Sequence, residues 1–489
     1  MKSFLHSAAP IILAVLPFAL SAQAETLQQR ITSVLEKPDY EAVSFVGISI
    51  LDTTTGEELF SQYTNKLFTP ASNAKLFSSA AALDVFGPDH TFQTTVHHDG
   101  TLEDGTLTGS LILHGGGDPT LFTDSLKALA AQVSEKVNVI HGNLIVDVSL
   151  FNSPLKGPGW MWDDNPDTYS MSISPLMLNY NTTRITVSQT QNGQLSARLF
   201  PETQYPVVEF LGGFGPVRIN RKPFHPTFTV TGSEIPESGR AETTLAVYDP
   251  APWIGHAFYS MLLEQGIEFT QAGDSGSTGT QPSTQPIVVA KVPQQGTQLC
   301  SVQSKPMSEI LTLFNKPSEN AIGEVLLHHL AGPTGAKPAN WRNGSAALAT
   351  WLEETVGLQK ESFRLQDGSG LTRYNLITPA GTTQLLQHMA KGPNAKTYLE
   401  SLPIAGVDGT LRNRMKTLPQ GAAIHAKTGT MSGVSCLSGY AKTPEGKWRT
   451  FSILVNGYTG SSNIARLLQD ELCVQLVALP TETFSTLKQ

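Results

Sequence analysis

The chain has 489 residues, of which 40% are hydrophobic and 15% are charged. This length favours about three domains, and the composition, with 42 Gly and 31 Pro, excludes collagen-like and disordered chains. Lys and Arg number 33 against 41 Asp and Glu, which gives a net charge of −8. A broad basic surface is therefore not available for phosphates or anionic lipid, and the sequence argues against nucleic acid as a partner.

The first 24 residues have the pattern of a secretory signal peptide. Lys2 precedes an apolar run from Ile11 to Leu20, and a site of small residues ends at Ala24. The run is shorter than the about 20 apolar residues that span a bilayer. We expect an exported protein without a transmembrane segment, and the short signal is typical of a Gram-negative periplasm.

The cysteines allow at most one internal disulfide in an oxidising compartment. Cys300, Cys436 and Cys473 could pair in three ways, and the sequence does not choose among them. Their spacing fits no zinc motif, and each is most simply a buried thiol. No metal and no cofactor is predicted.

The N-terminal part of the mature chain predicts a hairpin followed by a helix. Residues 41–51 and 59–63 alternate in the manner of strands and flank a turn at 52–56. The segment from Ser72 to Val85 is rich in small residues, and Gly87 with the following Pro ends it. We expect two opening strands and a helix that begins near Ser72.

The middle of the chain has a different residue pattern from the two ends. From about residue 94 to 297, short alternating segments with Gly, Asp and Asn turns predict mostly β structure with a few helices. Residues 273–285 form a linker rich in Gly, Ser, Thr and Pro. Helical patterns return at 310–330 and 339–356, and two strands are expected around Lys427. The two ends of the chain thus resemble each other more than either resembles the middle.

A Ser followed three residues later by Lys is the first candidate for chemistry. A nucleophilic Ser needs a base within hydrogen-bond reach, and a Lys with a lowered pKa can serve. Only one such pair, Ser72/Lys75, lies at the start of a predicted helix, where both side chains share a face and the helix dipole favours negative charge. The three pairs are Ser72/Lys75, Ser153/Lys156 and Ser485/Lys488.

Two further motifs follow Ser72 and Lys75 in the order of the active-site set of penicillin-recognising serine enzymes. They are Ser318-Glu319-Asn320 and Lys427-Thr428-Gly429-Thr430. In this set Ser72 attacks a carbonyl and Lys75 takes its proton. Lys427 is expected to lower the pKa of Lys75 and to hold an anionic substrate.

The remaining motif residues have roles of their own. Ser318 can pass a proton to the leaving amine, and Asn320 can bind the substrate amide and orient Lys75. Gly429 leaves room beside Ser72 and lets a substrate backbone approach the strand. The hydroxyls of Thr428 and Thr430 suit a terminal carboxylate. The backbone amides of Ser72 and Thr430 are expected to form an oxyanion hole.

The spacing of the motifs separates subfamilies. Roughly 240 residues lie between Lys75 and Ser318, far more than a compact β-lactamase core needs, so a long insertion must lie there. With the motifs, this arrangement resembles the class C low-molecular-mass penicillin-binding proteins, the penicillin-binding protein 4-type D-Ala-D-Ala carboxypeptidase/endopeptidase family. The resemblance includes four more runs, at 117–121 (GDPTL), 159–164 (GWMWDD), 367–373 (DGSGLTR) and 402–411 (LPIAGVDGTL).

The resemblance implies an activity. Such an enzyme cleaves the terminal D-Ala from peptidoglycan stem peptides and the cross-link between D-Ala and diaminopimelate, in both reactions through an acyl-Ser72 intermediate. β-Lactams acylate the same Ser72 and act as inhibitors. An acidic residue of the 159–164 run is implied to hold the free ammonium of diaminopimelate, and it maps best to Asp164, with Asp163 its neighbour.

The predicted fold class is α/β in the α+β sense, a β-lactamase/transpeptidase-like domain with an antiparallel sheet flanked by helices. Residues 1–24 are the signal peptide, 25–93 and 290–480 form the discontinuous catalytic domain, and 94–289 form inserted β-rich domains, two by our interpretation. The oligomeric state is not determined by the sequence, and a homodimer is one candidate.

Two other functions stay open. A β-lactamase would need a base that places water for fast deacylation, and the sequence contains no motif for it. A non-catalytic penicillin sensor or wall-binding protein on the same fold would not need Ser72 together with Lys75.

Overall fold

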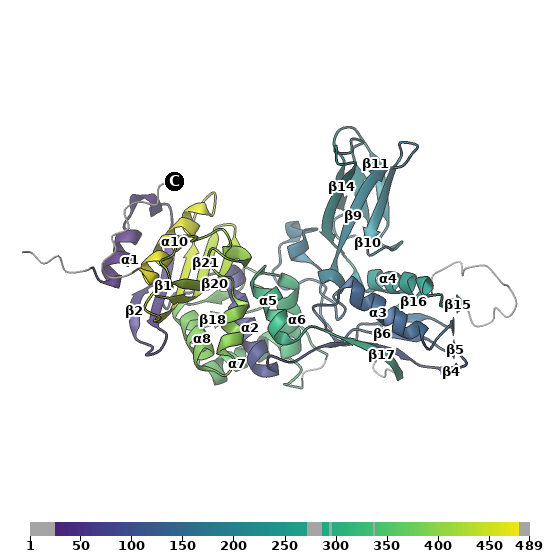
Figure 1. Ribbon diagram of the computed structural model, residues 1–489, viewed down its shortest axis with the longest axis horizontal. Helices are drawn as coiled ribbons and strands as arrows, with labels where there is room; N and C mark the ends of the chain where they lie inside the picture. Colours follow the sequence, from purple (N-terminus) through teal and green to yellow (C-terminus); the bar gives the residue numbers. More distant parts are fainter. Residues whose placement is uncertain (1–24, 271–285, 293–295, 336–337, 479–489) are drawn as a thin grey trace, which may run out of the picture.

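The computed structural model describes residues 25–270, 286–292, 296–335 and 338–478. The expected signal peptide and the linker at 273–285 lie outside the described residues. Figure 1 shows a sheet built from both ends of the chain, a group of helices beside it, and the middle of the chain on the other side of these helices.

The first sheet combines strands from both ends of the chain. Its order is β2-β1-β22-β21-β20, and every neighbouring pair is antiparallel. The predicted opening hairpin is confirmed as β1 and β2. The strands are β1 (Phe45–Asp52), β2 (Glu58–Gln62), β20 (Ala423–Met431), β21 (Val434–Lys442) and β22 (Trp448–Asn456).

Helices cover both faces of this sheet because its buried strands are apolar on both sides. Consecutive residues point to opposite faces, so Leu437 packs in one core cluster with α1 (Leu27–Leu35) and α10 (Asn463–Val477). Cys436 packs in the other cluster with the remaining helices of this part. These are α2 (Ala74–Phe86), α5 (Met307–Asn315), α6 (Asn320–Leu330), α7 (Trp341–Trp351), α8 (Pro379–Lys391) and α9 (Ala395–Ser401).

The helix expected from Ser72 begins differently. A single turn of 3₁₀ helix, Ala71–Asn73, precedes α2, so Ser72 lies in this turn and Lys75 in the first turn of α2. Both faces of α2 are buried among small and apolar side chains. The helix therefore runs through the core and holds the Ser72 turn at its N-terminal end.

The middle of the chain contains two sheets and two helices around one core. One sheet has the order β16-β8-β6-β3-β17 and the other β15-β7-β5-β4. Helices α3 (Thr123–Ser134) and α4 (Pro250–Glu264) pack with them. The strands are β3 (Gln93–His98), β4 (Thr101–Glu103), β5 (Thr106–Thr108), β6 (Leu111–His114), β7 (Val139–His141), β8 (Leu144–Asp147), β15 (Glu268–Thr270), β16 (Ile287–Ala290) and β17 (Thr297–Gln303).

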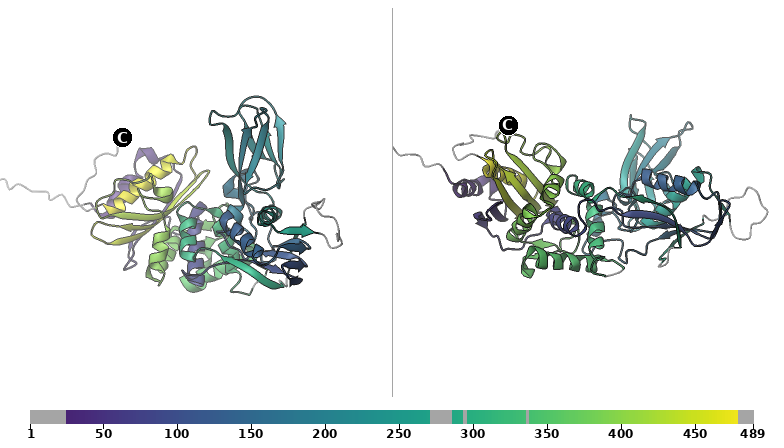
Figure 2. Two further views of the ribbon diagram at one scale, coloured as in Figure 1. Left: turned by 45° about the vertical axis from the view of Figure 1, so that its right-hand side comes forward. Right: turned by 60° about the horizontal axis from the view of Figure 1, so that its bottom comes forward.

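Two three-stranded sheets form a separate finger, which stands away from the first sheet in every view (Figures 1 and 2). They enclose a small core with Ile185 and Phe228. The strands are β9 (Thr182–Gln189), β10 (Leu195–Phe200), β11 (Val208–Gly212), β12 (Arg218–Arg221), β13 (Phe228–Thr231) and β14 (Arg240–Ala246). A short pair, β18 (Phe363–Arg364) and β19 (Leu376–Ile377), forms a separate two-stranded sheet just before α8 in the chain.

The pairing of β17 with β3 bears on the limits of the insertion. Residues 297–303 join the sheet that opens with β3, so this sheet extends past residue 290, where we placed the return to the catalytic domain. The division of the chain into domains stays a prediction.

Two sequence expectations concern features outside the sheets. Among the described residues, no helix has the length and apolarity needed to cross a membrane. Cys300, Cys436 and Cys473 are all buried and free, and burial raises the pKa of each thiol above its ordinary value.

A close backbone contact fixes α7 against α6. A Cβ atom at Gly344 would lie 2.2 Å from the carbonyl oxygen of Leu327. We predict that Gly344→Ala lowers the free energy of unfolding by about 1–3 kcal/mol, because the helices must separate. Calorimetry measures the change. Gly392→Ala, where the nearest atom would be 3.5 Å away, is the control, and equal stability of both variants would contradict the packing argument.

Candidate active site

Ser72 and Lys75 are in direct contact. Lys75 Nζ lies 2.9 Å from Ser72 Oγ, and the lysine side chain is fully buried. Two other oxygens receive hydrogen bonds from the same nitrogen, the side-chain oxygen of Asn320 at 2.6 Å and the carbonyl oxygen of Ser369 at 2.7 Å. Three segments of the chain thus meet at one amine.

Burial lowers the pKa of Lys75 to about 8, while the nearby carboxyl groups of Glu324, Asp367 and Glu319 oppose this change. The sequence expected burial or a second cation, Lys427, to lower this pKa, and burial is the largest cause. Desolvation disfavours the ammonium form without any second cation. Repulsion between the two amines contributes instead at Lys427, whose pKa lies well below its ordinary value through burial and the proximity of Lys75.

Lys427 and Ser318 form a second contact. Lys427 Nζ donates to Ser318 Oγ at 2.8 Å and to the carbonyl oxygen of Thr428 at 3.0 Å. Ser318 has a φ of 68°, a left-handed conformation that turns the chain sharply before α6. Glu319 then caps the helix, accepting from the amide of Ala321. The turn and the cap fix Ser318 and Asn320 side by side.

The amide group of Asn320 is used at both ends. Its oxygen accepts from Lys75, and its nitrogen donates to the carbonyl oxygen of Tyr169 at 2.8 Å. Tyr169 belongs to a 3₁₀ turn, Thr168–Ser170, in the middle of the chain. The middle of the chain therefore contacts the Ser318-Glu319-Asn320 motif itself.

The strand β20 lies against the Ser72 turn at Gly429. A Cβ atom there would lie 2.5 Å from the carbonyl oxygen of Pro70 and 3.0 Å from the amide nitrogen of Ser72. The space beside this glycine is thus filled by the protein's own turn. The hydroxyl of Thr428 donates to the hydroxyl of Thr410 at 2.8 Å, whereas Thr430 lines the cavity described next.

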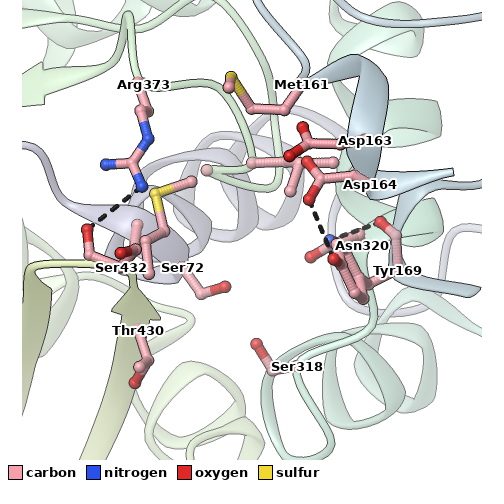
Figure 3. Close-up of a pocket in the computed structure, with 14 residues that line it drawn as sticks. Ser72, Met161, Asp163, Asp164, Tyr169, Ser318, Asn320, Arg373, Thr430 and Ser432 are labelled. Atoms are coloured by element: carbon pink, nitrogen blue, oxygen red, sulfur yellow. Dashed lines mark hydrogen bonds between the residues drawn. The ribbon is translucent and has the colours of Figure 1, made fainter. Parts of the chain in front are cut away.

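A cavity of about 580 Å³ opens beside Ser72. Figure 3 shows the hydroxyls of Ser72 and Ser318 pointing into the space between them. Asp163 and Asp164 approach from one side and Arg373 from another. The lining residues are Ala71, Ser72, Met161, Asp163, Asp164, Tyr169, Ser318, Asn320, Gly370, Leu371, Arg373, Thr430, Met431 and Ser432.

Asp164 is held in place at the rim of this cavity. It lies in a 3₁₀ turn, Trp162–Asp164, and accepts a hydrogen bond from the Tyr169 hydroxyl at 2.9 Å. Asp163 lines the cavity too. Arg373 donates to the carbonyl oxygen of Ser432 at 3.2 Å, which holds a cation at another side of the same cavity.

Sequence reasoning missed several residues around the motifs. Tyr169 and Arg373 line the cavity, and Glu324 and Asp367 are buried carboxyl groups close to Lys75. Arg373 and Asp367 lie in the run 367–373, which marked the resemblance but received no role. Tyr169 follows the run 159–164, and no pattern separated it from an ordinary turn.

The described Ser153/Lys156 pair does not form such a site. Ser153 Oγ is hydrogen-bonded to His328 at 2.8 Å. Lys156 donates instead to the carbonyl oxygen of Ser170. Ser485 and Lys488 lie outside the described residues.

The comparisons with known proteins agree on fold and family. The solved structure of penicillin binding protein 4 (dacB) from Haemophilus influenzae superimposes with a TM-score of 0.75, at 24% identity, over 90% of this chain and 97% of that chain. The predicted fold class is thereby confirmed. A predatory endopeptidase from Bdellovibrio bacteriovorus, in complex with an immunity protein, has a TM-score of 0.52 at 18% identity over 88% of this chain and 94% of that chain.

Sequence similarity defines the family. A D-alanyl-D-alanine carboxypeptidase from Actinomadura sp. (strain R39) is 35% identical over 479 residues, which cover 94% of this chain and 86% of the relative. DacB of H. influenzae, also a D-alanyl-D-alanine carboxypeptidase, is 26% identical over 86% of this chain and 87% of the relative. The sequence profile of the D-Ala-D-Ala carboxypeptidase 3 (S13) family matches residues 27–474. The chain belongs to this family of carboxypeptidase hydrolases, and the family resemblance found in the sequence is confirmed.

The contact at Gly429 can be tested directly. Gly429→Ala is expected to lower the rate at which a fluorescent penicillin labels the protein by about a hundredfold, because the added methyl group moves the Ser72 turn and shifts of about 1 Å at reacting atoms have this effect. Stopped-flow fluorescence gives the rate. Gly392→Ala serves as the control, and wild-type labelling by the Gly429 variant would show that the turn tolerates the methyl group.

Proposed function

We propose that this protein is a periplasmic serine D-Ala-D-Ala carboxypeptidase that also cleaves the cross-link between D-Ala and diaminopimelate, through an acyl-Ser72 intermediate. The observation that carries the proposal is the set of partners of Lys75 Nζ, namely Ser72, Asn320 and Ser369.

This set orients the lone pair of a neutral Lys75. The carbonyl oxygen of Ser369 can only accept hydrogen bonds. The oxygen of Asn320 also only accepts, and the bond from Asn320 to Tyr169 fixes which end of the amide faces the lysine. A neutral amine has two hydrogens, which these two oxygens occupy. The lone pair then faces Ser72 Oγ, the arrangement that a general base needs.

The reaction follows from these contacts. Lys75 takes the hydroxyl proton of Ser72 while Ser72 Oγ bonds to the carbonyl carbon, and the amides of Ser72 and Thr430 receive the oxyanion. The bond from carbon to nitrogen breaks as the leaving nitrogen takes a proton from the hydroxyl of Ser318. Lys427 then donates a proton to Ser318 Oγ. The proton that Lys75 gained returns to Lys427 through solvent, which restores both amines. Neutral Lys75 then takes a proton from water as the hydroxyl of that water bonds to the acyl carbon, and it returns this proton to Ser72 Oγ as the ester bond breaks.

The rim of the cavity suits a zwitterionic substrate end. Diaminopimelate carries an ammonium and a carboxylate at the end of its side chain, and Asp164 and Arg373 present the complementary charges to one cavity. In the proposal, Asp164 binds the ammonium and Arg373 the carboxylate. In the proposal, these two side chains bind a stem peptide that is part of a cross-link and also a stem peptide that is not cross-linked.

Relatives support the inhibitor and the endopeptidase parts of the proposal. The H. influenzae structure has also been solved with a β-lactam, at a TM-score of 0.71 to this chain. The Bdellovibrio neighbour with the same fold is an endopeptidase. Export to the periplasm rests on the expected signal peptide.

Turnover of muropeptides tests the proposal. Wild-type protein is expected to release D-Ala from a pentapeptide monomer and to split a D-Ala-diaminopimelate cross-linked dimer, and Ser72→Ala is expected to do neither, because it lacks the nucleophile. Mass spectrometry follows the products. Stable penicillin labelling without turnover by the wild type would favour the sensor, and rapid loss of the penicillin adduct would favour a β-lactamase.

The role of Asp164 has its own test. Asp164→Asn is expected to reduce kcat/KM on peptides with a free diaminopimelate ammonium by about tenfold or more, the size of a lost charge-assisted hydrogen bond. Labelling by a penicillin that has no ammonium group should not change, because it has no charge for Asp164 to bind. Asp163→Asn is the matched control, since only Asp164 is bound by Tyr169. Equal losses in both variants would remove the special role of Asp164.

A further inference from the structure

The loop at residues 367–372 carries the carbonyl oxygen of Ser369 that receives a hydrogen bond from Lys75. Its backbone also touches the start of α2, because Ser78 Oγ donates to the carbonyl oxygen of Gly368 at 2.6 Å. A Cβ atom at Gly370 would lie 1.9 Å from the carbonyl oxygen of Ala71. The position of this loop therefore sets the position of an essential acceptor and of the wall behind the Ser72 turn.

Glu324 holds this loop from the side of α6. One carboxylate oxygen accepts from the amide of Gly368 at 3.0 Å and the other from the amide of Ser369 at 2.9 Å. The side chain is fully buried. Because Glu324 comes one helical turn after Asn320, both side chains lie on the face of α6 that looks toward Lys75. A single helix thus controls two of the three partners of the lysine.

A second buried carboxyl group, Asp367, shapes the rest of the loop. It accepts from the amides of Gly370 at 2.8 Å and Thr372 at 2.7 Å, and from the indole of Trp160 at 3.1 Å. Asp367 and Glu324 repel each other, and burial raises the pKa of both. This repulsion is offset by the backbone amides, by the side chains of Trp160 and Asn375 and by the buried amine of Lys75, so the carboxyl groups and this amine form one charge cluster.

We propose that Glu324 is a positioning residue of the reaction, which fixes the carbonyl group of Ser369 against Lys75 and places a carboxyl group in the same buried charge cluster. Glu324 touches no substrate and acts through Lys75 and the loop. This inference rests on the proposed function, in which Lys75 is the base that activates Ser72.

The charge of Glu324 has a defined effect on pH dependence. The groups that face Lys75 are Glu324, Asp367 and Glu319, which raise its pKa, and Lys427. As a base Lys75 must be neutral, so acylation should increase with pH through a midpoint near its pKa of about 8. The midpoint belongs to the whole cluster. Burial and Asp367 raise the pKa of Glu324 to about 8, so this carboxyl group is ionised at and above the midpoint. Removing its negative charge there destabilises the ammonium form of Lys75 and moves the midpoint to lower pH.

The test is the rate of Ser72 acylation by a fluorescent penicillin, measured from pH 5 to 10 for the wild type and three variants. Glu324→Gln is expected to move the midpoint down by roughly one pH unit. It should also reduce the maximal rate by about tenfold, since one amide loses its acceptor. A merely structural role would lower the melting temperature without moving the midpoint.

Glu324→Asp separates the charge from the contact. It keeps the carboxylate but is one methylene shorter and does not reach both amides, so the midpoint should stay at the wild-type pH while the maximal rate falls. The Glu324→Asp variant also tests the proposal if the Glu324→Gln variant does not fold. Asp118→Asn is the control, because Asp118 is a buried carboxyl that binds the amide of Thr120 away from Lys75, and neither midpoint nor maximal rate should change.

The outcomes are distinct. An unmoved midpoint in Glu324→Gln, or a full maximal rate in Glu324→Asp, would overturn the role of Glu324. If the wild type itself is not acylated at Ser72, the proposed function fails instead, whatever the variants do.

Discussion

The buried amine of Lys75 is the constraint on which the rest of the site depends. Removing an amine from water costs several kcal/mol unless oxygen atoms replace the solvent, and here Ser72, Asn320 and Ser369 supply them. Only Ser72 is close in sequence. The other two oxygens reach the lysine because α6 and the loop at 367–372 pack against α2, so the chemistry at Ser72 depends on long-range packing that the sheet and its helices maintain.

The inserted segment belongs to this arrangement. The carbonyl oxygen of Tyr169 binds the amide of Asn320, and the indole of Trp160 binds Asp367. Both contacts lie directly behind partners of Lys75. The same segment carries Asp163 and Asp164 to the rim of the cavity. One stretch of chain therefore supports the contacts of Lys75 and lines the cavity beside Ser72.

Much of the fold could be predicted because it depends on local pattern. The alternation of residues 41–51 predicted the strand that became β1, and the small residues after Ser72 predicted α2. The pairing of β17 with β3 was not predictable in the same way. Two short strands about 200 residues apart have no local signal for each other, since pairing is decided by which sheet edge is free when the core forms.

The sequence by itself determined the candidate set, Ser72 with Lys75, Ser318 with Asn320, and Lys427 before Gly429. The order of these motifs marks the set, and the spacing of the first and last pairs puts their side chains on one face of a helix or a strand. Only the tertiary structure decided what surrounds them. The tertiary structure places Glu324 and Asp367 near Lys75, and it buries this lysine, which lowers its pKa. It also puts the turn of Ser72 against Gly429. Burial and long-range contact arise from packing of distant segments, and no spacing along the chain encodes them.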